Sequence, residues 1–190
     1  MSEPAGVLPD ADLFSRDHFA LFGLPRRFAI DERALESRYH ELQSAAHPDR
    51  HAHRPEQERR LSMQWATRIN EGYRLLRAPL TRARYLLELS GVDVGAENNT
   101  AMPADFLMQQ MEWREALDEA RAPADAERLA QLAELIDEQR GRLMADLEAA
   151  IDVRADFVAA ADLVRRLMFI DKFREELREA AQDLPHRASA

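Results

Sequence analysis

Apolar residues recur along most of this chain at helical spacing, with one apolar side per predicted helix. In the first half the pattern predicts four helices, which begin near Asp17, Asp31, Pro55 and Pro79. Asp accepts hydrogen bonds from the free amides of a first helical turn, and Pro needs no amide partner there, so both residue types mark helix starts. The expected core of this half consists of Phe19, Phe22, Leu24, Phe28 and Ile30.

The second half predicts three longer helices, over residues 103–121, 123–149 and about Val153 to Leu184. The breaks between them are short, which favours antiparallel neighbours in a three-helix bundle. Few Gly and few β-branched residues also favour helices, so the predicted fold class is all-α. The expected core of the bundle consists of Leu129, Leu132, Leu135, Ile136, Leu143, Leu147, Leu163, Leu167, Ile170 and Leu177.

A stretch rich in Gly, Asn and Asp, without helical periodicity, separates the two halves. The predicted organisation is a flexible N-terminus over 1–16, a first domain over 17–90, a linker over 91–102, a second domain over 103–184 and a flexible tail over 185–190. Charge follows the same division, because residues 17–90 carry a net charge of +3 and residues 91–190 a net charge of -10. A mildly basic half therefore precedes an acidic one.

Composition removes several classes of function. The net charge of -9 disfavours nucleic acid and anionic membrane surfaces as partners. The absence of Cys removes thiolate metal sites and a cysteine nucleophile, and we expect no cofactor. No stretch is apolar enough to span a membrane, and the acidic N-terminus does not resemble a signal peptide, so we expect a cytoplasmic protein.

The sequence His47-Pro48-Asp49 follows the second predicted helix. Pro48 prevents the helix from continuing and favours an extended His47, so an imidazole and a carboxylate are displayed at a tight turn. Such a turn can present Asp49 to an arginine of a partner. Two alternatives remain: a solvated turn without function, and a metal site formed by His47, His51 and His53, although Pro48 disrupts the helix that such a site would need.

The helix predicted over 103–121 is apolar on two sides. On a helical wheel one side carries Phe106, Trp113 and Leu117. The other side carries Leu107, Met108 and Met111 together with Glu112, Glu115 and Glu119. Because unpaired carboxylates are costly to bury, we expect this second side to face solvent and to bind a partner. The alternative is that its apolar residues pack against the first domain.

Four strings along the chain resemble the HscB family of J-type co-chaperones in iron–sulfur cluster assembly. They are residues 19–25 (FALFGLP), 69–73 (INEGY), 79–87 (PLTRARYLL) and 106–112 (FLMQQME). The tripeptide also lies where J domains carry their signature, between a helix with Tyr39 and a helix with Asn70 and Tyr73. The resemblance extends from about Asp17 to Leu177 and implies a J domain followed by a C-terminal three-helix bundle.

The resemblance further implies an adaptor without enzymatic activity of its own, and we expect no bound metal because Pro48 disrupts the helix that a histidine site would need. Its J domain would dock on a DnaK-type ATPase, HscA, and stimulate ATP hydrolysis, while its bundle would bind the scaffold protein IscU. The implied chaperone contacts are His47, Pro48, Asp49, Arg38 and Arg50. The implied scaffold contacts are Leu107, Met108, Met111, Glu112, Glu115 and Phe169. On the helical wheel Phe169 lies off the core direction of Leu163, Leu167 and Ile170, and the alternative is an aromatic residue at the edge of the core.

Two other classes of function stay open on the residues alone. One is a metal-assisted hydrolase that uses His47, Asp49 and His51, although the chain has no Gly-rich phosphate loop and no His-Glu-x-x-His pattern. The other is a plain helical scaffold protein. Glu36 and Glu41 interrupt the basic residues of the helix before the tripeptide, and a mixed surface of this kind favours a specialised chaperone partner over a promiscuous one.

Overall fold

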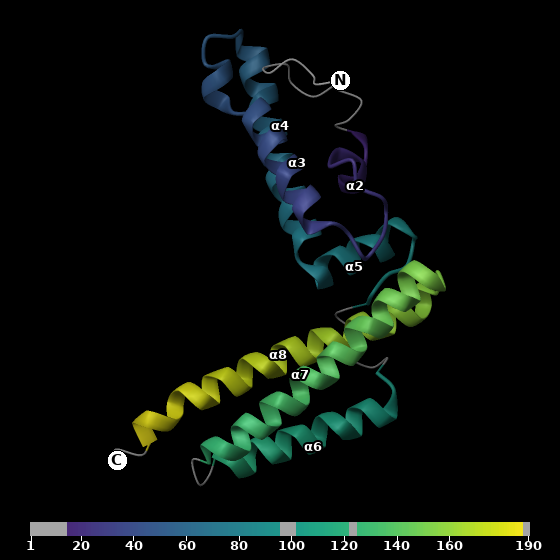
Figure 1. The fold of residues 1–190 in the computed structure, drawn as a ribbon, viewed down its shortest axis with the longest axis vertical. Helices are drawn as coiled ribbons and strands as arrows, with labels where there is room; N and C mark the ends of the chain where they lie inside the picture. Colours follow the sequence, from purple (N-terminus) through teal and green to yellow (C-terminus); the bar gives the residue numbers. More distant parts are fainter. Residues whose placement is uncertain (1–14, 96–101, 122–124, 188–190) are drawn as a thin grey trace. The chain divides into compact units, whose positions relative to one another are not determined.

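The structure, a computed structural model, describes residues 15–95, 102–121 and 125–187. All regular secondary structure within these ranges is helical, which confirms the all-α prediction (Figure 1). The chain divides into two compact units, Met1–Leu86 and Leu87–Ala190. Most of the predicted flexible N-terminus, the middle of the predicted linker and the last three residues of the predicted tail lie outside the described residues.

The first unit contains α2 (His18–Leu21), α3 (Glu32–Ala45), the short 3₁₀ turn η1 (Pro48–His51), α4 (Glu56–Arg77) and most of α5 (Pro79–Leu89). The predicted start residues have the expected roles. The Asp17 carboxylate accepts from the Ala20 amide at 3.0 Å, and Asp31 accepts from the Arg33 and Ala34 amides. The starts of α2 and α3 therefore follow from local capping chemistry.

Helices α3 and α4 lie side by side, and a tyrosine joins them (Figure 1). The Tyr39 ring stacks on Tyr73 with ring centroids 4.1 Å apart. Its hydroxyl donates to Asn70 Oδ1 at 2.9 Å and accepts from Gln43 Nε2 at 2.9 Å. These contacts hold α3 against α4, the two helices that the segment containing η1 connects.

The core of the first unit is formed mainly by aromatic and long aliphatic side chains. Phe19, Phe22 and Phe28 are buried as expected, whereas Leu24 and Ile30 are only half-buried. The fully buried members also include Leu21, Leu35, Trp65, Ile69 and Leu76. A buried arginine, Arg82, lies over the Phe28 ring and donates to the Leu76 carbonyl, so its charge is accommodated by a ring face and a backbone dipole.

The second unit contains α6 (Ala104–Arg121), α7 (Ala126–Glu148), the π-helical turn η3 (Ala149–Val153) and α8 (Phe157–Arg187) (Figure 1). Most of the expected core is buried, but the expectation for Leu135 was wrong, since its side chain is 46% exposed. Leu135 is about 100° around α7 from the fully buried Ile136, outside the stripe that packs. Leu163 is half-buried.

The connection from α7 to α8 also differs from the prediction. A helix was expected from Val153, but α8 begins at Phe157. Ala155 adopts a left-handed conformation with φ of 51° and ends the preceding helix. The Asp156 carboxylate then accepts from the Ala159 amide at 3.0 Å and starts the next one.

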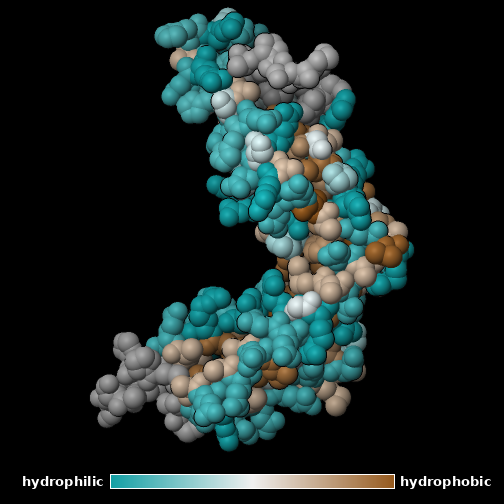
Figure 2. All heavy atoms as spheres, in the orientation of Figure 1, coloured by the Kyte–Doolittle hydropathy of each residue, from teal (hydrophilic) through white to brown (hydrophobic). Residues whose placement is uncertain are grey.

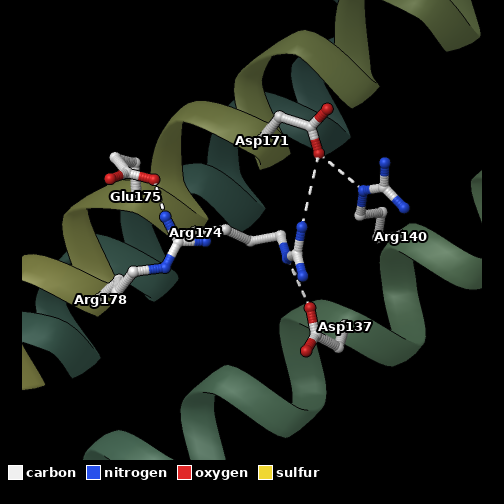
Figure 3. Close-up of polar contacts among 6 residues, drawn as sticks. All are labelled: Asp137, Arg140, Asp171, Arg174, Glu175 and Arg178. Atoms are coloured by element: carbon white, nitrogen blue, oxygen red, sulfur yellow. Dashed lines mark hydrogen bonds and ion pairs between the residues drawn. The ribbon is translucent and has the colours of Figure 1, made fainter. Parts of the chain in front are cut away.

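Ion pairs join α7 to α8 (Figure 3). Arg140 Nε of α7 lies 2.6 Å from Asp171 Oδ1 of α8. Arg174 of α8 contacts Asp137 of α7 and also Asp171 on its own helix. All four side chains are partly exposed, so each pair contributes up to about 1 kcal/mol to stability. The pairs therefore add a small contribution to the association of α7 and α8, whose facing sides are mainly apolar.

Residues at the predicted linker take part in the second unit. Val94 is buried, and its carbonyl accepts from Arg165 of α8 at 3.0 Å. Figure 2 shows a largely hydrophilic visible face in which hydrophobic side chains gather in narrow strips. No helix in the described ranges combines the length and the hydropathy needed to cross a bilayer.

Candidate functional site

The turn after α3 is built by backbone hydrogen bonds around one proline. His47 is extended, with φ of -62° and ψ of 126°, as expected for a residue before proline. Within the turn, the Arg50 amide donates to the His47 carbonyl at 3.0 Å, and the Arg54 amide donates to the His51 carbonyl at 2.9 Å. The tripeptide therefore occupies a tight, defined turn rather than an open loop.

The side chains of His47 and Asp49 project into solvent, with 53% and 92% of their surfaces exposed. His47 Nδ1 accepts from the Asp49 amide at 3.3 Å and lies 3.8 Å from the Asp49 carboxylate. The first contact needs an unprotonated Nδ1 and the second a protonated one, so only one can form at a time. When Nδ1 is unprotonated, the imidazole accepts from the Asp49 amide and the Asp49 carboxylate stays available to a partner.

The two arginines predicted to accompany the tripeptide lie on different elements. Arg38 lies on α3 and pairs with Glu41 at 3.0 Å, whereas Arg50 is an exposed residue of η1. An exposed pair one helical turn apart contributes little energy. A partner's carboxylate can therefore replace Glu41 on Arg38 at small cost.

The three histidines considered as metal ligands have different environments. His47 and His53 are exposed, but His51 is 3% exposed and its Nε2 lies 2.9 Å from the Ala45 carbonyl oxygen. In the described ranges, no group of three or more His, Asp or Glu side chains is placed to hold a metal ion. The burial of His51 was not predicted, and no feature of the sequence distinguishes it from His53.

Helix α6 has a buried and an exposed apolar side, as the helical wheel predicts. Phe106, Trp113 and Leu117 are at most 4% exposed. On the other side, Leu107, Met108 and Met111 are 40%, 64% and 71% exposed, and we call these three residues the apolar strip. Glu112 and Glu115 are also exposed on α6. The strip is thus an accessible apolar surface with carboxylates on the same helix.

Phe169 of α8 belongs to an aromatic cluster that joins α8 to α6. Its ring centroid lies 5.8 Å from Phe106, 6.4 Å from Trp113 and 6.0 Å from Phe173, and the Arg114 guanidinium lies over the ring at 5.9 Å. Phe169 itself is half-buried. It therefore both packs at the edge of the core and keeps part of its surface exposed.

The chain is similar along most of its length to known co-chaperones. It is 57% identical to a protein named co-chaperone protein HscB homolog from Aromatoleum aromaticum, over 89% of this chain and 96% of that protein. A protein of the same name from Azoarcus sp. (strain BH72) is 54% identical over the same shares. The family described as the HSCB C-terminal oligomerisation domain matches residues 102–178.

Two solved structures share the fold. Chaperone HscB from Vibrio cholerae aligns with a TM-score of 0.77 and 35% identity, covering 89% of this chain and 99% of that one. Human co-chaperone protein HscB aligns with a TM-score of 0.81 and 26% identity, covering 94% and 90%. These similarities confirm the predicted J domain and C-terminal helical bundle. The chain belongs to the HscB family of co-chaperones.

Proposed function

We propose that this chain binds an iron–sulfur scaffold protein of the IscU type, delivers it to a DnaK-type chaperone of the HscA type, and stimulates that chaperone's ATPase during cluster maturation and transfer. The turn formed by His47, Pro48 and Asp49 would contact the chaperone, and the apolar strip would contact the scaffold. The observation that supports this proposal is that two exposed features of different chemistry lie on two separate compact units.

The chemistry of the turn supports a charged contact with the chaperone. The Asp49 carboxylate is almost fully exposed and is offered by a turn whose backbone bonds are already made. An arginine of the chaperone can take both carboxylate oxygens in one planar contact. Because the turn is preformed, little conformational entropy is lost when it binds. Arg38 and Arg50 would add attraction to acidic residues around that arginine.

The chemistry of the strip supports an apolar contact with the scaffold. Methionine side chains are flexible and polarizable, so Met108 and Met111 can adapt to a partner's surface. Burial of such side chains is stabilising by about 25 cal/mol per Å² of apolar surface. Glu112 and Glu115 would select a scaffold with basic residues beside its own apolar patch. The open part of Phe169 would extend the contact onto α8.

The proposed activity needs no catalytic group in this chain. One chain that holds both partners gives each a local concentration near the other in the millimolar range for a short tether. The chaperone therefore meets the scaffold far more often than it would by free diffusion. The chaperone hydrolyses ATP, and the cluster is cargo on the scaffold.

Replacement of Asp49 by alanine tests the chaperone contact. We expect Asp49→Ala to reduce stimulation of the chaperone ATPase roughly tenfold or more, since a hydrogen bond between charged groups contributes about 1.5–3 kcal/mol. The measurement is steady-state ATP hydrolysis by the purified chaperone over a concentration series of the co-chaperone. Glu88→Ala, which removes an exposed carboxylate from α5, is the matched control. Equal stimulation by both variants would exclude this role for Asp49.

The double variant Met108→Ala/Met111→Ala tests the scaffold contact. Each truncation of an interface residue of this kind costs about 1–2 kcal/mol, so scaffold affinity should fall at least about tenfold. Calorimetric titration with the scaffold measures the change, and Leu135→Ala/Val158→Ala supplies a control that removes two other exposed apolar side chains, one from α7 and one from α8. Unchanged affinity with a lowered melting temperature would instead favour packing of the strip inside the protein.

A further inference from the structure

The two ends of the turn η1 differ in solvent exposure. His47 and Asp49, near its start, are exposed, and His51, its last residue, is 3% exposed. His53, two positions later, is exposed again. One residue of this short stretch therefore anchors it to the interior, and that residue carries an imidazole rather than an aliphatic side chain.

The contact made by the His51 ring fixes which nitrogen holds the proton. Nε2 lies 2.9 Å from the Ala45 carbonyl oxygen, and a carbonyl only accepts, so Nε2–H is the donor. The other ring nitrogen, Nδ1, is buried without a hydrogen-bond partner among the described residues. A neutral ring with its proton on Nε2 satisfies the carbonyl and leaves no buried charge.

The acceptor is a carbonyl at the C-terminal end of α3. Ala45 is the last residue of that helix, and the last four carbonyls of a helix have no partner within it. The Ala46 amide bonds to the Leu42 carbonyl, and His51 supplies a donor for the Ala45 carbonyl. The bond therefore closes a loop from the end of α3 to the end of η1, and the exposed side chains of His47 and Asp49 lie within that loop.

We propose that His51 is a positioning residue for the chaperone contact: by donating Nε2–H to the Ala45 carbonyl it holds the His47–Asp49 turn in the conformation that the chaperone binds. The effect on chaperone binding rests on the proposed function, whereas the hydrogen bond that holds the turn does not. If the bond is lost, the turn occupies other conformations for part of the time. The apparent affinity then falls in proportion to the competent fraction, while the maximal rate at saturation is unchanged.

The first test concerns the ring and the turn and needs no chaperone. Long-range ¹⁵N–¹H spectra of the histidine rings in the full chain report which nitrogen is protonated, and we expect the proton of His51 on Nε2. Backbone ¹⁵N relaxation should show that the Asp49 and Arg50 amides become more mobile in His51→Phe, which keeps an aromatic ring but has no donor. A proton on Nδ1 in the native chain, or unchanged mobility in a folded His51→Phe, would overturn the proposal.

The second test measures chaperone stimulation as a function of co-chaperone concentration. We expect His51→Phe to raise the half-maximal concentration roughly two- to tenfold, the range set by one neutral hydrogen bond, with the maximal rate retained. His51→Gln, whose amide can donate to the same carbonyl, should restore the native value to within about twofold. His53→Phe is the matched control and should have no effect. A native half-maximal concentration for His51→Phe would contradict the proposal.

Failure of the proposed function and failure of the positioning role of His51 give different results. If the native chain does not stimulate the chaperone at all, the proposed function fails, and the ring protonation and the amide mobility still decide whether His51 holds the turn. If the native chain stimulates and His51→Phe is equally effective, only the positioning role fails.

Discussion

Helix α2 packs very closely against α4 at Gly72. A Cβ atom added there would lie 2.6 Å from His18 Nδ1 and 2.9 Å from Phe22 Cε2. Contacts below 3 Å force a shift, and both neighbours are side chains at α2, one of them a buried aromatic ring. The close packing of α2 on α4 therefore requires glycine at this position.

We expect Gly72→Ala to lower the free energy of unfolding of the first unit by up to about 2 kcal/mol, because overpacking costs about 1–3 kcal/mol and the gain in helix propensity offsets part of that cost. The clash outweighs the gain in helix propensity, which is about 1 kcal/mol for this change. Urea unfolding followed by circular dichroism measures the difference. Gly141→Ala in α7, where an added Cβ meets nothing within 4 Å, is the control and should be stabilising. A stabilised Gly72→Ala would show that the two helices can separate without cost.

His18 gives the first unit a predictable response to pH. Burial, and secondly the charge of Arg68, hold the pKa of His18 below its ordinary value of 6.5, against the opposing effects of Glu71 and Asp17. The folded state therefore binds a proton less readily than the unfolded state. Stability contributed by the neutral ring is complete above about pH 6.5 and is lost as the pH falls towards the folded pKa.

We expect the unfolding free energy of the native chain to fall more steeply than that of His18→Asn between about pH 7 and pH 5. Urea titrations of both proteins at several pH values measure the difference between them, which removes the contribution of the other histidines. Parallel pH profiles would mean that His18 is as readily protonated in the folded chain as in the unfolded chain.

At the residue scale, the sequence predicts side-chain environments through helix phase and the cost of burying charge. Both rules apply on α6, which is why the exposure of Met108 and Met111 could be predicted. They fail for Leu135, which is apolar but lies beside the packed stripe of α7. They also fail for His51, because its burial depends on the carbonyl of Ala45, a contact that exists only after α3 and η1 have folded together.

At the element scale, helix starts could be predicted where the sequence carries a cap or a proline. Asp17, Asp31, Pro55 and Pro79 mark starts because their chemistry acts within one turn. The beginning of α8 could not be predicted in this way. Residues 149–156 contain neither Gly nor Pro, and the residue that breaks the helix is an alanine with positive φ.

That alanine supplies a prediction for the connection between α7 and α8. An L-residue in the left-handed region costs about 1–2 kcal/mol, and glycine avoids this cost but loses more entropy on folding. We therefore expect Ala155→Gly to stabilise the second unit by about 0.5–1 kcal/mol, measured as an increase in the urea midpoint with an unchanged slope. Ala145→Gly in the regular helix α7 is the control and should be destabilising by about 1 kcal/mol. A destabilised Ala155→Gly would mean that the observed φ is not maintained in solution.

At the scale of the whole molecule, the proposed coupling requires both contacts in one chain. Asp49→Ala should keep its affinity for the scaffold, and Met108→Ala/Met111→Ala should keep its stimulation of the chaperone alone. A mixture of the two variants should not restore scaffold-dependent stimulation, because the high local concentration exists only within a single chain. ATPase assays with the scaffold present, at equal total co-chaperone concentration, measure this difference. Full activity of the mixture would show that the two sites work independently.

The distribution of tryptophan has a practical consequence. The chain has two, Trp65 at 0% and Trp113 at 4% exposure, and they belong to different units. Each half thus contains its own intrinsic fluorophore, shielded from water until that half melts. Replacing one tryptophan by phenylalanine leaves the other as the single indole fluorophore. Its fluorescence then follows the unfolding of its own unit in the intact chain, without an added label.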